Sequence, residues 1–182
     1  MDETTLLSDI HAQFRRLRCG AVAESLQAQG IRYRLAWGVE SYRLKEIAQR
    51  YRPDASLAER LWNEETRESR MLATRLYPLE SLTEEKAEEW SQQIPYAEIA
   101  DQACMNLFAR APFATRLIER WLTGTPMQRY CALQLALRLD YRPTHVVQQA
   151  AQMAADALQP AWLRAAAVRF GAENQEIGRA HV

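Results

Sequence analysis

Apolar residues recur at intervals of three and four positions along nearly the whole chain, a spacing that gathers side chains on one face of a helix. No stretch of useful length alternates apolar and polar residues as a half-buried strand does. The pattern therefore predicts an all-α protein. The helical stripes comprise Leu44, Ile47, Ala48 and Tyr51; Leu57, Leu61 and Trp62; Met71, Leu72 and Leu76; Ala87, Trp90 and Ile94; Ala100, Ala103, Cys104 and Leu107; Ala114, Leu117, Ile118 and Trp121; and Val146, Val147, Ala150, Ala154 and Leu158.

Local signals mark where several of these helices begin and end. Thr83 is a suitable N-cap, and Glu84 and Glu85 follow it in the first turn, where carboxylates complement the helix dipole. Proline or glycine closes most segments, and a last helix is expected after Pro160. The segment 127–139 is apolar on most sides, which predicts a helix buried among its neighbours.

The number and length of the helices favour one all-α architecture. About ten helices of similar length follow one another through short turns, without a sustained heptad. Because no such helix buries a face alone, neighbouring helices should stack in antiparallel pairs. We therefore expect an α-α superhelix, or solenoid, of helical-hairpin repeats rather than a four-helix bundle. The 182 residues suffice for one compact domain.

Composition argues against several classes of protein. The acidic start is not followed by an apolar leader segment, and no apolar run reaches the roughly 20 residues of a membrane helix. The three cysteines and three histidines are scattered, and no Cys-x-x-Cys pair occurs. We therefore expect a cytoplasmic protein with reduced thiols, no membrane association, no metal site and no cofactor.

The charges are balanced in number but not in position. The chain has 23 basic and 23 acidic residues, and 21 of the basic ones are arginines. Nine basic and three acidic residues lie in 15–52, four and ten in 64–101, and nine and five from 102 onward. The basic flanks are compatible with a nucleic-acid surface and equally with solvated helix faces. The arginine excess fits phosphate binding, but a GC-rich genome also produces it.

Several segments between residues 36 and 140 together resemble one known family. Their order and spacing as a set carry the resemblance, since each piece alone is what any packed helix requires. The family is the DNA alkylation repair family, the HEAT-like-repeat alkylpurine DNA glycosylases. The matching segments are Gly38-Val39; Leu44-Lys45-x-Ile47-Ala48-x-x-Tyr51; Leu61-Trp62 and Glu68-x-Arg70-Met71-Leu72-Ala73; Thr83-Glu84 and Glu88-Glu89-Trp90; and Asp101-x-x-Cys104-x-Asn106-Leu107-Phe108 with Pro112-Phe113.

The resemblance implies HEAT-like repeats with a concave, arginine-lined groove that holds duplex DNA carrying alkylated bases. It implies hydrolysis of the N-glycosidic bond of an alkylated purine, with a carboxylate stabilising the cationic sugar. That carboxylate corresponds to Asp101, which lies inside a predicted helix and has no capping role there. The family also implies a monomer associated with the bacterial nucleoid. The candidate DNA-binding residues are Arg129, Arg43, Lys45, Arg15 and Arg16.

The chain departs from the family pattern beside this aspartate. Catalytic members carry a tryptophan four residues earlier and an acidic residue directly after it, whereas this chain has Ala97 and Glu98. Tyr96 and Trp162 are the candidate aromatic contacts, although Tyr96 lies about 100° around the helix from Ala97. Two alternatives to a glycosylase therefore stay open, namely a non-catalytic DNA-binding solenoid and a protein-binding scaffold.

The last seven residues, 176–182, need a separate interpretation. They can be encoded by GAG-ATC-GGA-AGA-GCA-CAC-GTC, a run that contains the start of a widely used short-read sequencing adapter. We therefore expect a single repeat domain over 1–175, truncated at its C-terminus, followed by a non-native tail. A natural tail that matches by coincidence is the alternative.

Overall fold

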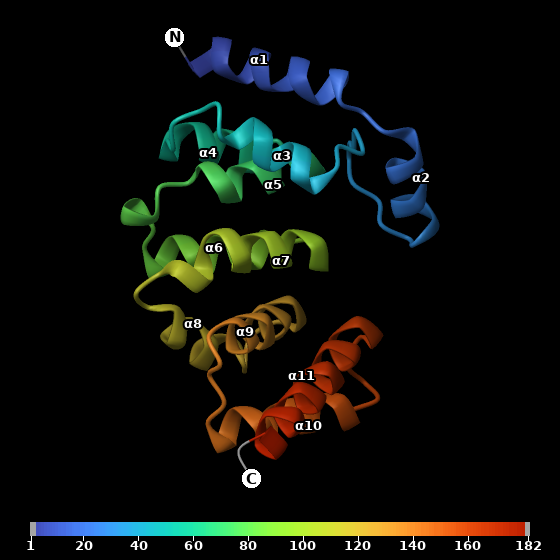
Figure 1. The fold of residues 1–182 in the computed structure, drawn as a ribbon, viewed down its shortest axis with the longest axis vertical. Coiled ribbons are helices and arrows are strands. Elements are labelled where there is room, and N and C mark those ends of the chain that lie inside the picture. The colour runs from blue at the N-terminus through green and yellow to red at the C-terminus, as the bar shows by residue number, and fades with distance from the viewer. Residues whose placement is uncertain (1–2, 181–182) are drawn as a thin grey trace. The chain divides into compact units, whose positions relative to one another are not determined.

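The computed structural model describes residues 3–180, and describes side chains over 3–175. This part of the chain contains eleven α-helices and two 3-10 helices and no strand (Figure 1), so the predicted all-α class is confirmed. The helices divide into two compact units, Met1–Leu82 and Thr83–Val182, which are described in turn. The extent predicted for the domain, 1–175, and the nature of 176–182 stay predictions, since the side chains of that tail lie outside the described residues.

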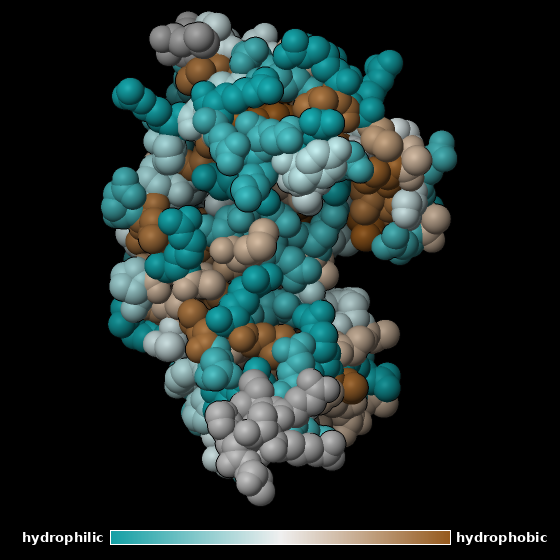
Figure 2. Space-filling model, in the orientation of Figure 1, coloured by the Kyte–Doolittle hydropathy of each residue, from teal (hydrophilic) through white to brown (hydrophobic). Residues whose placement is uncertain are grey.

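The first unit is built around a helical hairpin. Helices α4 and α5 pack on each other across the short turn 64–66, α3 packs on α5, and α1 packs on α4. Trp62 is buried in this core, as its place on an apolar stripe predicts. The helices are α1 (Glu3–Arg16), α2 (Gly20–Ala28), α3 (Ser41–Ala48), α4 (Ala55–Asn63) and α5 (Arg67–Leu76), followed by the 3-10 turn Leu79–Ser81. An apolar patch lies over α2 at the surface (Figure 2).

A buried carboxylate fixes the loop that leads into α3. Glu68 is fully buried, and its two oxygens accept the backbone N–H groups of Trp37, Gly38 and Val39 at 3.0, 2.9 and 3.1 Å. The Arg67 guanidinium balances its charge at 2.9 Å. Gly38 is required because its φ is +74° and because an added Cβ would lie 2.1 Å from the Cys19 carbonyl oxygen. Two of the segments that carry the family resemblance therefore meet in one structural contact.

The second unit is arranged around α9, which packs against α6, α7, α8 and α11. The helix is buried on most sides, as its sequence predicts, and α10 and α11 form a helical hairpin (Figure 1). Trp90 and Trp121 are buried core residues, also as predicted. The elements are α6 (Glu84–Gln93), α7 (Ala97–Asn106), the 3-10 turn Phe108–Arg110, α8 (Ala114–Trp121), α9 (Pro126–Arg138), α10 (Thr144–Ala155) and α11 (Ala161–Ala180).

Two helix starts in this unit are capped by threonine side chains. Thr83 accepts the Lys86 N–H at 3.1 Å, which confirms the predicted cap of α6. Thr125 forms a capping box with Gln128, in which each side chain bonds the other's backbone N–H. These bonds satisfy N–H groups that otherwise lack partners at a helix start.

Four residues assigned to helical stripes lie outside helices: Ile94 and Leu107 are the C-cap residues of α6 and α7, and two others lie farther from a helix end. Tyr51 follows the end of α3 at Ala48, and its hydroxyl donates to the Asp9 carboxylate on α1 instead. Leu158 follows the end of α10 and is 93% exposed. In that turn the Asp156 carboxylate accepts the Leu158 N–H at 2.9 Å, a local bond that competes with helix continuation. The apolar spacing of the sequence continues past the end of each helix, whereas the helical conformation of the backbone stops there.

Candidate functional site

Asp101 lies on α7 at the edge of an open cavity of about 360 Å³ in the second unit. Its side chain is half-buried and faces residues from two further helices. The other lining residues are Gln134, Leu137 and Arg138 from α9, and Arg169 and Glu173 from α11. The predicted site residue is therefore one of two carboxylates, with Glu173, in a mixed polar cavity and is not part of a solvated acidic face.

One aromatic residue contacts this carboxylate, and a second packs on the first. The Tyr130 hydroxyl donates to Asp101 Oδ1 at 3.0 Å. The ring of Trp162 meets the Tyr130 ring edge-on, with the centroids 5.8 Å apart and the planes at 69°. Trp162 is 40% exposed, which is unusual for so large an apolar side chain. The structure thus links the sequence candidate Trp162 to Asp101 through Tyr130.

Helical periodicity explains why these side chains converge. Tyr130, Gln134 and Arg138 are spaced four residues apart and share one face of α9. Trp162, Arg169 and Glu173 are spaced by seven and four residues on α11. Because α9 packs against both α7 and α11, these two stripes lie around Asp101.

The surroundings of Asp101 act on its charge in opposite directions. Burial is the largest influence and raises the pKa of the Asp101 carboxyl above its ordinary value. The Tyr130 hydrogen bond and the positive charges of Arg138 and Arg169 oppose this rise in pKa. Burial and the nearby carboxylate also raise the pKa of Tyr130, so its hydroxyl keeps its proton and stays a donor.

The cavity also contains a buried amide with an unused donor. Gln134 is 5% exposed, and its Oε1 accepts a hydrogen bond from Arg169 Nη2 at 2.9 Å. Its Nε2 has no hydrogen-bond partner among the described residues. A buried donor is destabilising unless an acceptor outside the chain, such as a water or a ligand, bonds it.

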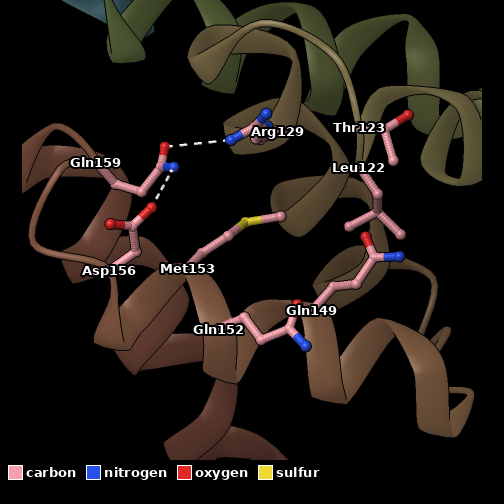
Figure 3. A pocket seen from close by; sticks show the side chains of 8 residues that line it. All are labelled: Leu122, Thr123, Arg129, Gln149, Gln152, Met153, Asp156 and Gln159. Atoms are coloured by element: carbon pink, nitrogen blue, oxygen red, sulfur yellow. Dashed lines mark hydrogen bonds between the residues drawn. The ribbon is translucent and has the colours of Figure 1, made fainter.

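Arg129 lies in a different cavity. Its guanidinium approaches Gln159 Oε1 at 3.3 Å, at a hollow of about 410 Å³ between α9 and α10 (Figure 3). Gln159 in turn donates to Asp156 at 2.9 Å. None of the residues that line this hollow lines the Asp101 cavity. The structure therefore brings Arg138 and Arg169, and not Arg129, to the carboxylate.

Tyr96 is the residue at the N-cap position of α7 and does not line the Asp101 cavity. Ala97 and Glu98 form the first turn of the same helix. Ala97 lies one turn before Asp101, on the same helix face. The aromatic residue nearest to the carboxylate comes instead from α9, namely Tyr130.

The basic candidates of the first unit lie on two helices. Arg15 and Arg16 stand exposed in the last turn of α1, where positive charge also complements the helix dipole. Arg43 on α3 pairs with Glu46 at 3.0 Å and stacks on Tyr42, whereas Lys45 is exposed. Arg15, Arg16 and Lys45 form no hydrogen bond or ion pair with the described residues and are available for a partner.

Within the described residues, no group of three or more His, Cys, Asp or Glu side chains could hold a metal ion. None of the helices searched in that part of the chain is both long and apolar enough to span a membrane.

Comparison with known proteins agrees with this architecture. The family model described as DNA alkylation repair enzyme matches residues 10–159, and the chain belongs to this family. A solved structure titled "A new family of proteins related to the HEAT-like repeat DNA glycosylases with affinity for branched DNA structures" aligns with 93% of this chain and 74% of its own, at a TM-score of 0.76 and 15% identity. This likeness confirms a HEAT-like helical-repeat fold. Comparison with curated proteins found no match.

Five polar residues at or beside the cavity were not singled out from the sequence: Tyr130, Gln134, Arg138, Arg169 and Glu173. Tyr130, Gln134 and Arg138 follow one another at four-residue spacing on α9, which is visible in the sequence. However, that helix is so apolar that its few polar positions give no signal of a site. Their role depends on the contact of α9 with α7, which no local signal contains.

Proposed function

We propose that the protein binds duplex DNA at the Asp101 cavity and removes alkylated purines as a DNA glycosylase. The observation that carries this proposal is a half-buried carboxylate at an open cavity, flanked by two arginines and a tyrosine. A carboxylate with a perturbed pKa in such a cavity is a typical candidate for a functional group. Membership of the DNA alkylation repair family supports the same substrate class.

The reaction needs little from the protein besides electrostatics. An N3- or N7-alkylated purine carries a positive charge, and when its bond to C1′ breaks, the electron pair neutralises the departing base. Positive charge then develops on the sugar, where an ionised Asp101 would stabilise it. Water adds to C1′ and releases a proton, which leaves an abasic site. Tyr130 donates a hydrogen bond of 3.0 Å to one carboxylate oxygen and so holds the carboxylate in place.

Three of the remaining cavity residues suit the DNA backbone, although Glu173, which also lines the cavity, lies 3.9 Å from Arg169 and partly offsets its charge. Arg138 and Arg169 would bind phosphates beside the lesion, and the unused Nε2 of Gln134 would donate to a phosphate oxygen. Trp162, exposed next to Tyr130, offers an aromatic surface to the sugar or backbone. Since no base pocket is needed, the shallow form of the cavity is consistent with this role.

The proposal is tested by base release from methylated duplex DNA with purified full-length protein. We expect Asp101→Asn to lose activity while keeping DNA affinity. Glu98→Gln is the matched control, because it removes a neighbouring carboxylate of the same helix that does not line the cavity. Absence of base release by the wild-type protein, beside an active known glycosylase, would reject the proposal.

A second candidate function is DNA binding without catalysis. Ala97 in place of the family tryptophan favours it, since an aromatic face is missing one turn before Asp101. The structural neighbour, described as having affinity for branched DNA, makes junction DNA the natural probe. Tighter binding to a four-way junction than to duplex, unchanged by Asp101→Asn and without base release, would favour this function. If the protein does not bind DNA even at low salt, the protein-binding scaffold is the function that remains.

A further inference from the structure

A second cavity, of about 270 Å³, lies in the first unit and takes no part in the proposed reaction. It lies between α1 and the segment before α3, close to the start of α5. Its polar and aromatic lining consists of His11, Arg15, Arg34, Trp37, Glu64 and Thr66.

Positive charge prevails in this cavity. Glu64 is the carboxylate of the lining, and its Oε2 already accepts His11 Nε2 at 2.9 Å and the Ser69 hydroxyl. Arg34 donates from Nη2 to the Glu64 carbonyl oxygen at 2.9 Å, which fixes the guanidinium and leaves further N–H donors. Arg15 has no hydrogen bond or ion pair within the described part of the chain. The two guanidinium groups therefore suit an anion such as a phosphate.

The deepest polar group of the cavity lacks a partner. Thr66 is 5% exposed, and its Oγ1 forms no hydrogen bond with any described residue. A buried hydroxyl in a native structure is nearly always bonded to protein, water or a ligand, so this one can bond a polar atom that does not belong to the chain. The hydroxyl both donates and accepts, and it therefore tolerates the edge of any nucleobase.

Trp37 supplies an aromatic side chain to the same cavity. Its backbone N–H is held by the buried Glu68 carboxylate at 3.0 Å, so the residue is anchored at a fixed loop. Aromatic side chains beside basic groups are the usual means by which proteins bind an unpaired nucleotide. The indole suits the face of a base, the arginines suit a phosphate, and the hydroxyl suits the polar edge of the base. Together they suit one nucleotide.

We propose that this cavity binds a single nucleoside phosphate. The base stacks on Trp37 and hydrogen-bonds the Thr66 hydroxyl, while Arg15 and Arg34 hold the phosphate. The ligand is either an unpaired nucleotide within a DNA strand or a free mononucleotide, which share this chemistry. All groups involved belong to the first unit, so the inference is independent of catalysis at Asp101.

The test measures binding of deoxyadenosine monophosphate and of a single-stranded deoxyadenosine decamer to the full-length protein by calorimetry. We expect Trp37→Ala to weaken binding of the preferred probe about 5- to 100-fold, the range that base–aromatic stacking provides. Thr66→Val should weaken it about 3- to 10-fold without lowering Tm, because the hydroxyl it removes has no partner. Arg15→Ala should weaken binding more than Arg16→Ala, an equal charge change next to it that lies outside the cavity.

Comparison of the two probes identifies the source of the ligand. If the mononucleotide and the decamer bind the site with equal affinity, the ligand is a free mononucleotide. If the decamer alone binds, the ligand is a nucleotide within a strand. Affinities that do not change in Trp37→Ala and Thr66→Val would overturn the proposal, as would no binding of either probe. Inorganic phosphate that binds as tightly as the nucleotide would also overturn it, because the base would then contribute nothing. Base release from methylated DNA, measured on the same variants, reports separately on the Asp101 site.

Discussion

Asp101 combines two properties that a purely structural residue seldom has. It lies in a protein interior that disfavours its charge, and it is placed beside an open cavity. Its neighbours Tyr130, Arg138 and Arg169 compensate this burial only in part, because the pKa of the carboxyl remains above its ordinary value. Such a residue is expected to favour function at the expense of stability.

This balance gives a prediction for thermal stability. A carboxyl whose pKa is raised on folding stabilises the native state below its unfolded pKa of about 3.9, and that contribution is lost as pH rises through the folded pKa. The ionised Asp101 therefore destabilises the fold at neutral pH. Asp101→Asn should raise Tm at pH 7 by about 1–3 °C, with a smaller gain near pH 3. Calorimetric melting across this pH range measures both values.

Asp156→Asn is the matched control for this measurement. Hydrogen bonds from Gln159 and from the Leu158 N–H lower the pKa of Asp156, so its ionised form is favoured in the native state. Asp156→Asn should therefore lower Tm at pH 7 or leave it unchanged. A fall of Tm in Asp101→Asn at neutral pH would show that Asp101 is a stabilising structural residue.

At the scale of elements, Glu68 ties the loop 37–39 to α5 through three backbone N–H groups. In Glu68→Gln, an amide nitrogen replaces one acceptor oxygen and faces a donor, while Arg67 loses its buried counter-charge. We expect a loss of about 3 kcal/mol in the free energy of unfolding, measured by urea denaturation. Glu80→Gln, at an exposed position, should change it by no more than about 0.5 kcal/mol. Equal stability of the two variants would contradict this account.

The elements also show how far sequence reasoning extends. The Thr83 cap and the buried character of α9 were predictable because both are written in local sequence. Tyr51 and Leu158 were assigned wrongly, since apolar spacing continued beyond the point where turns end α3 and α10. Asp101 was predicted through the family resemblance, but its partner Tyr130 lies 29 residues away and is joined to it only by packing. The buried position of Glu68 likewise depends on a contact with a loop 29 to 31 residues earlier.

At the scale of the whole molecule, equal numbers of basic and acidic residues conceal a local gathering of cations, such as Arg138 and Arg169, that suits a polyanion. Their use in DNA binding should appear in the salt dependence of affinity, because each phosphate contact releases counterions. Arg138→Ala and Arg169→Ala should each reduce the slope of log K against log salt by about 0.9 on duplex DNA. Fluorescence anisotropy between 50 and 200 mM salt, a range suited to such slopes, provides the measurement.

Arg116→Ala is the control for this salt dependence. Arg116 carries the same charge in the same unit, but it is paired with Glu84 at 2.5 Å and does not line the Asp101 cavity. The slope should therefore stay unchanged in this variant. Identical slopes for all three variants would indicate that the Asp101 cavity is not where duplex DNA binds.

The most direct test of the account is the single-turnover rate of purine release from methylated duplex DNA, with protein in excess over DNA. If Asp101 stabilises charge on the sugar, the wild-type protein should release alkylated purine well above the spontaneous rate. Asp101→Asn should then reduce that rate by about 100- to 1000-fold, at unchanged DNA affinity. A wild-type rate equal to the spontaneous one, or an Asp101→Asn rate equal to wild type, would contradict the central claim.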